Sequence, residues 1–143
     1  MISLIDTNVI VRFLTASKEK KYHGLYAFFS AAERGQIRTE LKLIVLFQVI
    51  FVLKSVYKVP EKDIAESLLA LLEYKGISVS RKKLVRRTLE VWRDNFGLDV
   101  VDAYLIANLE RYPENVLYSY DRGFDRFGIR RKEPGNLGTS IKI

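Results

Sequence analysis

Four aspartates in this sequence lie where ordinary surface charge does not explain them. Asp6 follows the first apolar, β-branched run of the chain, and Asp121 follows another strand-like run. Asp99 and Asp102 lie one helical turn apart, at the start of an otherwise apolar stretch. Clustered carboxylates repel one another unless a cation lies between them, and oxygen-only ligands favour Mg²⁺ or Mn²⁺. Asp99 can equally act as the N-cap of its helix.

The composition narrows the chemistry that remains. The 143 residues, of which 48% are hydrophobic, suffice for one domain with a sizeable core, and we expect residues 1–143 to form a single domain. The absence of cysteine excludes disulfides, thiolate catalysis and cysteine-bound zinc. The single histidine, His23, argues against a Ser–His triad or a histidine-based metal centre. The net charge of +7 suits a polyanionic partner, although ordinary solubility charge explains it equally well.

Hydrophobic periodicity predicts alternating strands and helices. Strands are expected at residues 2–5, 37–39, 77–80 and 115–120. A first helix follows Asp6 and ends near residues 15–17; further helices are expected at residues 18–34, 41–57, 61–74, 81–96 and 99–111, before a turn-rich basic tail. This order predicts an α/β fold with a parallel sheet covered by helices on both faces. In such a sheet the strand ends at Asp6 and Asp121 can be neighbours, and a helix start can bring Asp102 to the same edge.

Three segments together resemble one known family. They are Ile-Asp-Thr-Asn-Val at the start, Asp-Val-Val-Asp-Ala-Tyr-Leu-Ile-Ala near residue 100, and Ser-Tyr-Asp-Arg-Gly-Phe-Asp-Arg-Phe near residue 120. In this order and spacing they are similar to the PIN-domain nucleases, and most of all to the VapC-type toxins of toxin–antitoxin pairs. The resemblance covers essentially the whole chain. It implies a three-layer α/β/α domain with a central, mostly parallel sheet, whose acidic residues hold Mg²⁺ or Mn²⁺ and hydrolyse RNA.

The resemblance assigns roles to individual residues of this chain. Asp6 matches the first acid of the family, Asp102 the acid that precedes an alanine, and Asp121 the last acid, so these three are the expected metal ligands. Asp99 matches an acid that many members have one turn before Asp102, and it joins the expected catalytic set. Ser119 matches the hydroxyl residue two positions before the last acid. Ser119 and Asn8 are expected to orient the metal-binding carboxylates without binding the metal themselves.

Gln48 departs from the family pattern. The family places a glutamate in its apolar helix, whereas this chain has glutamine at that point of Phe-Gln-Val-Ile-Phe-Val-Leu, residues 47–53. The Gln48 amide oxygen can accept a hydrogen bond or ligate weakly, but it adds no charge and cannot act as a base. Glu40 is an imperfect substitute, because in a continuous helix it would lie about 12 Å from Gln48. If Glu40 instead ends its own strand, it can reach the same edge; we favour the first arrangement.

The cations offer candidates for holding RNA. Arg12, Arg122 and Arg126 are the primary RNA-binding candidates. A basic helix supplies a second set: Arg81, Lys82, Lys83, Arg86 and Arg87. For each cation of both sets, taken individually, a solvated surface position is the simpler explanation.

Expectations for partners and location follow from the resemblance and from what the sequence lacks. RNA, a small antitoxin protein and a second copy of the chain in a homodimer are the expected partners. Neither a signal peptide nor a membrane-spanning run is evident, so we expect a cytoplasmic protein. Two alternatives remain. Gln48 allows a degenerate PIN-fold module that binds RNA or a partner without strong catalysis, and an unrelated phospho-acceptor domain would need a strand-end lysine that the sequence does not convincingly provide.

Overall fold

The structure, a computed structural model, describes residues 2–135; the two ends of the predicted domain, residue 1 and residues 136–143, lie outside the described part. The elements along the chain are α1 (Thr7–Leu14), the 3-10 helix η1 (Lys20–Tyr22), α2 (Leu25–Glu33), β1 (Thr39–Glu40), α3 (Leu43–Ser55), α4 (Glu61–Leu72), β2 (Ile77–Ser78), α5 (Lys82–Asp94), α6 (Val100–Arg111), β3 (Val116–Tyr118), the 3-10 helix η2 (Arg122–Phe127) and β4 (Arg130–Lys132). The predicted α/β fold with parallel strands is confirmed.

The strands form two separate parallel pairs. In the first, β1 pairs with β2, with Thr39 opposite Ile77, and Leu4 adds a single parallel bridge to Glu40. In the second, β3 pairs with β4, with Val116 opposite Arg130. Within residues 2–135 no strand pairing joins the two. The strand runs that precede Asp6 and Asp121 are therefore not neighbours in this structure.

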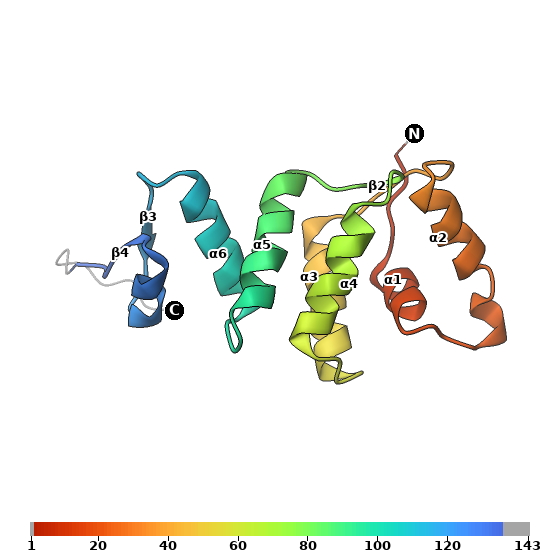
Figure 1. Cartoon of the computed structure of the whole chain (residues 1–143), viewed down its shortest axis with the longest axis horizontal. Coiled ribbons are helices and arrows are strands. Elements are labelled where there is room, and N and C mark those ends of the chain that lie inside the picture. The colour runs from red at the N-terminus through yellow and green to blue at the C-terminus, as the bar shows by residue number, and fades with distance from the viewer. Residues whose placement is uncertain (1, 136–143) are drawn as a thin grey trace.

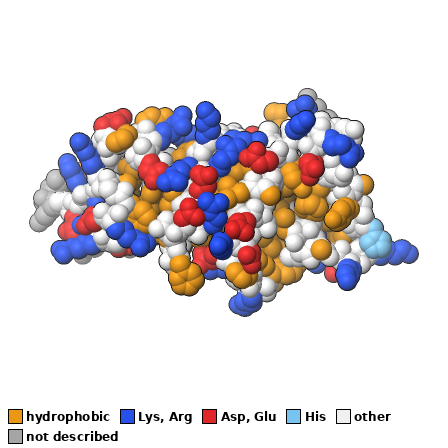
Figure 2. Space-filling model, viewed as in Figure 1, with side chains coloured by type: hydrophobic (Ala, Val, Ile, Leu, Met, Phe, Trp, Pro, Cys, Tyr) orange, Lys and Arg blue, Asp and Glu red, His pale blue; other side chains and the backbone are white. Residues whose placement is uncertain are grey.

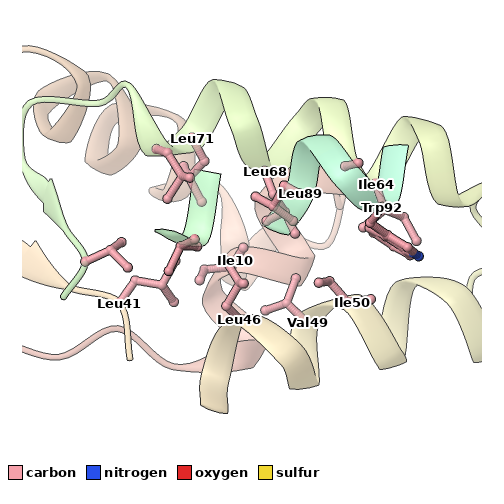
Figure 3. Packing of buried hydrophobic residues seen from close by; sticks show 14 of the residues in the cluster. Ile10, Leu41, Leu46, Val49, Ile50, Ile64, Leu68, Leu71, Leu89 and Trp92 are labelled. Carbon is pink, nitrogen blue, oxygen red and sulfur yellow. The ribbon is translucent and has the colours of Figure 1, made fainter. Parts of the chain in front are cut away.

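The core fills the space between the helices. Buried side chains recur on α3 and α4 at spacings of three and four residues, which gives each helix one apolar face. Figure 3 shows them converging with side chains of α1 and α5 and with Leu41, which follows β1. Trp92 of α5 is almost wholly buried, and its Nε1 donates to Oε2 of Glu61 at 2.7 Å. Trp92 is thus a core residue with a satisfied polar atom.

Helices α3, α4, α5 and α6 form a continuous block. Helix α5 packs on both α4 and α6. Arg87 of α5 donates from Nε and Nη2 to the two carboxylate oxygens of Glu110 on α6, at 2.8 and 3.1 Å. The rings of Phe47 on α3 and Tyr104 on α6 meet edge to face with centroids 5.7 Å apart. Figure 1 shows this block standing between α1 on one side and the β3–β4 pair on the other.

Several local predictions are wrong. The helix predicted at residues 18–34 is broken: η1 ends at Tyr22, and α2 begins only after Gly24, a residue that destabilises a helix interior. The predicted buried strand at residues 2–5 makes only one bridge, and Ile2 and Leu4 are 78% and 61% exposed. The continuous helix over residues 40–48 is also wrong, because Glu40 lies in β1.

The segment predicted as a turn-rich tail contains η2 and the unpredicted strand β4. None of the helices within residues 2–135 has the length and apolar character needed to cross a membrane.

Candidate functional site

Three of the four predicted aspartates meet at one cleft. Asp99 directly precedes α6, Asp102 lies in the first turn of α6, and Asp121 directly precedes η2. They line a cleft of about 270 Å³, which we call the acidic cleft. Its remaining lining comes from the loop before α6 and from η2: Gly97, Leu98, Gly123, Phe124, Arg126 and Phe127.

Backbone hydrogen bonds hold two of these aspartates in place. Oδ1 of Asp99 accepts from the backbone N–H of Val101 at 2.8 Å, so the alternative role of Asp99 as N-cap of α6 is confirmed. Oδ1 of Asp121 accepts from the backbone N–H of Gly123 at 2.8 Å in the same way. A Cβ on Gly123 would lie 2.9 Å from that oxygen, so glycine permits the close approach. Each bond uses one carboxylate oxygen and leaves the other available.

Asp102 differs from these two neighbours. Its side chain is half-buried, whereas Asp99 and Asp121 are exposed, and within residues 2–135 its carboxylate enters no hydrogen bond or ion pair. Burial raises the pKa of Asp102 above its ordinary value, and the negative charges of Asp99 and Asp121 raise it further. The ionised carboxylate is therefore poorly solvated and repelled by its neighbours.

The donor set of the acidic cleft fits a hard divalent cation in kind. All three side chains offer carboxylate oxygen, and a cation among them would offset the repulsion that raises the pKa of Asp102. The set is incomplete, however: within residues 2–135 no three His, Cys, Asp or Glu side chains lie close enough together to hold an ion.

The remaining expected ligand lies elsewhere. Asp6 precedes α1; its side chain is exposed and makes no capping hydrogen bond. The next residue, Thr7, donates from Oγ1 to Oε1 of Gln48 on α3 at 2.8 Å, which places Gln48 beside the start of α1. Neither Asp6 nor Gln48 lines the acidic cleft. Figure 1 shows α1 and η2 on opposite sides of the block of α3 to α6.

The hydrogen bond between Thr7 and Gln48 was not predicted from the sequence. A threonine directly after Asp6 and at the start of a helix is typical of a helix cap, yet the Thr7 side chain bonds across to α3. The available signal was the polar Gln48 within the most apolar helix, since a polar side chain there needs a partner.

Asn8 and Arg12 bond to each other rather than to a carboxylate of the acidic cleft. Oδ1 of Asn8 accepts from Nε of Arg12 at 3.2 Å, and Nδ2 of Asn8 donates to the Tyr22 hydroxyl at 3.4 Å. The Arg12 guanidinium also lies 4.9 Å from the ring centre of Tyr22 and pairs with Glu19 at 3.4 Å. This network fastens η1 to α1.

Around Asp121 the local supports are polar. Oγ of Ser119 accepts from the backbone N–H of Asp121 at 3.0 Å and so fixes the turn that presents this aspartate. Arg131 of β4 was not singled out from sequence. It donates to both oxygens of Asp125 at 2.8 and 3.2 Å and to the carbonyl of Ser119 at 3.0 Å. Arg131 thereby ties β4 to η2, and its hydrogen bonds to the Asp125 carboxylate, together with its charge, lower the pKa of Asp125.

The predicted cations lie in different settings. Arg126 lines the acidic cleft and covers the ring of Phe127, and Arg122 is exposed next to Asp121. On α5, Arg86 pairs with Glu73 and Arg87 with Glu110, whereas Arg81, Lys82 and Lys83 line a separate cleft with Arg111. Figure 2 shows Lys and Arg at the end formed by β3 and β4, and cations mixed with acids over the middle.

Glu40 does not reach the acidic cleft either. It lies in β1 opposite Ser78, and its carboxylate pairs with Nζ of Lys42 at 2.9 Å. This ion pair offsets its charge, so Glu40 is a poor replacement for the missing glutamate at position 48.

Comparison with known families agrees with this architecture. The sequence profile of the PIN domain matches residues 3–129. No curated protein matched the sequence closely enough to count as a relative. PIN domains are generally metal-dependent nucleases that use divalent ions such as Mg²⁺ or Mn²⁺. Because the match spans most of the chain and includes both the start of α1 and the acidic cleft, this protein belongs to the PIN domain family.

Proposed function

We propose that this protein is a divalent-metal-dependent endoribonuclease that hydrolyses RNA phosphodiesters with Mg²⁺ or Mn²⁺. The observation that carries the proposal is the environment of Asp102. Its half-buried carboxylate has no bonding partner within residues 2–135, and its pKa is raised by burial and by Asp99 and Asp121. Such repulsion destabilises a fold unless a ligand offsets it, and a divalent cation is the ligand that three carboxylates select.

The residues of the chain divide the work as follows. Asp102 and the free oxygens of Asp99 and Asp121 are the ligands that the acidic cleft offers to the ion. Asp6 lies across the block of α3 to α6 from this cleft (Figure 1), so in this proposal it completes the ligands only from a second copy of the chain. Ser119 keeps Asp121 in position through the backbone N–H that it binds. When bound, the ion activates water and offsets the charge that develops on the scissile phosphate.

Cations beside the acids hold the RNA backbone. Arg126 lines the acidic cleft and Arg122 lies next to Asp121, whereas Arg12 lies on α1, on the side of Asp6. Because these contacts are electrostatic, RNA affinity is expected to fall as the salt concentration rises. The overall charge of +7 supports the same role.

The finer biological role is that of the toxin in a toxin–antitoxin pair, acting in the cytoplasm and restrained by a small antitoxin protein. Its support is the similarity of the three sequence motifs to VapC-type toxins. Induced expression in a bacterial host should then arrest growth, while the Asp102→Asn variant, expressed to the same level, should not. Equal growth with both proteins would contradict the toxin role.

A second candidate function is favoured by Gln48, which removes one carboxylate from the expected ligands. In that case the protein is a PIN-fold module that binds RNA or a partner without cutting it. A Mn²⁺ titration coupled to cleavage of a labelled RNA separates the two. Metal-dependent cleavage that Asp102→Asn abolishes supports the nuclease. Metal-independent RNA binding without cleavage, in both wild type and Gln48→Glu, supports the binding module.

A further inference from the structure

The segment before α1 has one open edge. The carbonyl of Ser3 and the N–H of Ile5 bond to the backbone of Glu40, at 2.8 and 3.2 Å. In a strand the groups of the intervening residue point to the other side, and within residues 2–135 the N–H and C=O of Leu4 enter no backbone hydrogen bond. The Leu4 side chain is 61% exposed. This edge can therefore accept another strand.

Strand β3 has a matching open edge. Within the described residues it pairs only with β4, and Tyr118 is 68% exposed. Parallel strands are normally buried on both faces, and an exposed apolar edge is a template for pairing with another strand. The chain thus carries two incomplete edges, each followed by an acid of the candidate site: Asp6 after the first, Asp121 after the second.

The two edges are held apart within one chain. The block of α3 to α6 stands between them in Figure 1, and it is fastened by the Phe47–Tyr104 ring contact and by the two bonds from Arg87 to Glu110. Joining the edges inside one chain would require this packing to rearrange. A second copy can supply the missing strand to each edge with the packing intact.

The strand directions permit such an exchange. In Figure 1 both the segment before α1 and β3 run from top to bottom. A two-fold axis along the strands leaves their direction unchanged, so both pairings between two copies can be parallel at once. The arrangement closes on itself as a dimer and leaves neither edge open.

We propose that two copies of this chain exchange strands in this way, and that Asp6 of each copy completes the acidic cleft of the other. Residues 2–5 of one copy pair with β3 of its partner, which brings Asp6 to the strand end at which Asp121 lies. Each of the two metal centres then takes Asp6 from one chain and Asp99, Asp102 and Asp121 from the other. The metal-binding part of this inference rests on the proposed nuclease function; the strand pairing does not.

Cross-linking tests the pairing without any need for activity. Because the chain has no cysteine, Leu4→Cys and Tyr118→Cys introduce single thiols at exposed positions on the two edges. The two variants are unfolded and refolded together, then treated with a short bis-maleimide. We expect covalent dimers from this mixture but few from Tyr26→Cys with Tyr118→Cys, because Tyr26 is exposed on α2, away from both edges. A Leu4→Cys, Tyr118→Cys double variant that links only within its own chain would overturn the pairing.

Complementation tests the shared centre. Asp6→Asn and Asp102→Asn are each expected to be inactive alone. Refolded together in equal amounts, half of the dimers combine the two variants and each of these has one intact centre, so about a quarter of wild-type RNA cleavage should return. If wild type cleaves RNA but the mixture regains no activity, the shared centre is wrong and the nuclease function stands. If the inter-chain cross-links form and wild type cleaves no RNA, the pairing stands and the nuclease function is wrong.

Discussion

The acidic cleft and the start of α1 contain the two parts of one expected site, and they are built differently. In the cleft, backbone N–H groups fix Asp99 and Asp121, while Asp102 remains half-buried, unpaired and repelled. At the start of α1, Asp6 is exposed. The neutral side chain of Gln48, on α3, lies close by and accepts a hydrogen bond from Thr7. Under the proposed function, the cleft is the part whose charge repulsion a cation would offset, and the residues at the start of α1 would complete and position its ligands.

The largest expected effect is the loss of Asp102. Asp102→Asn should reduce metal-dependent RNA cleavage by about 100-fold or more, since it removes the ligand whose charge is least compensated. Cleavage of a labelled RNA at saturating Mn²⁺ measures this. Asp94→Asn is the matched control, because Asp94 is an exposed aspartate bonded to its neighbour Arg93. A similar loss in both variants would remove the distinction between the cleft and ordinary surface acids.

Restoring the family's acid on the α1 side should have a smaller effect in the opposite direction. Gln48→Glu adds a carboxylate beside Thr7 and should tighten Mn²⁺ binding about 10-fold, with a matching gain in cleavage at low metal concentration. Gln48→Leu controls for the loss of the amide. Should Gln48→Glu lose activity instead, the amide itself is used, and the weakened-site interpretation of Gln48 is wrong.

In the metal-free protein, Asp102→Asn should stabilise the fold. Because the folded-state pKa of Asp102 is raised, its ionisation penalty is absent below the unfolded-state pKa of about 4 and grows as the pH rises through the folded-state value. Asp102→Asn should therefore raise Tm by about 2–4 °C at pH 7. The gain should disappear at pH 3 and when Mg²⁺ is added to the wild type.

The smallest expected effect concerns the support on the α1 side. Thr7→Val removes the 2.8 Å bond to Gln48 while keeping the side-chain shape. The free energy of unfolding should fall by about 0.5–1 kcal/mol in urea denaturation. Cleavage should fall less than in Asp102→Asn. A loss of activity as large as that of Asp102→Asn would mean that the α1 side does more than position its residues.

The sequence predicted the acidic cleft better than it predicted the sheet. The sequence predicted that Asp102 and Asp121 meet with Asp6 at one sheet edge. Asp102 and Asp121 lie together even without that edge, because a single short strand separates α6 from Asp121. The position of Asp6 depends on which strands pair. Strands of two or three residues carry too little alternation to specify a partner. The same shortness concealed β4, and the aromatic periodicity of residues 18–34 concealed the break at Gly24.

The central claim is that the acidic cleft binds a divalent ion through Asp102. Its most direct test is a Mn²⁺ binding isotherm, followed by the electron paramagnetic resonance signal of free Mn²⁺, for the wild type and for Asp102→Asn. The account predicts one bound ion per chain in the wild type and at least about 10-fold weaker binding in the variant. Equal affinity in the two proteins, or no binding in either, would contradict it.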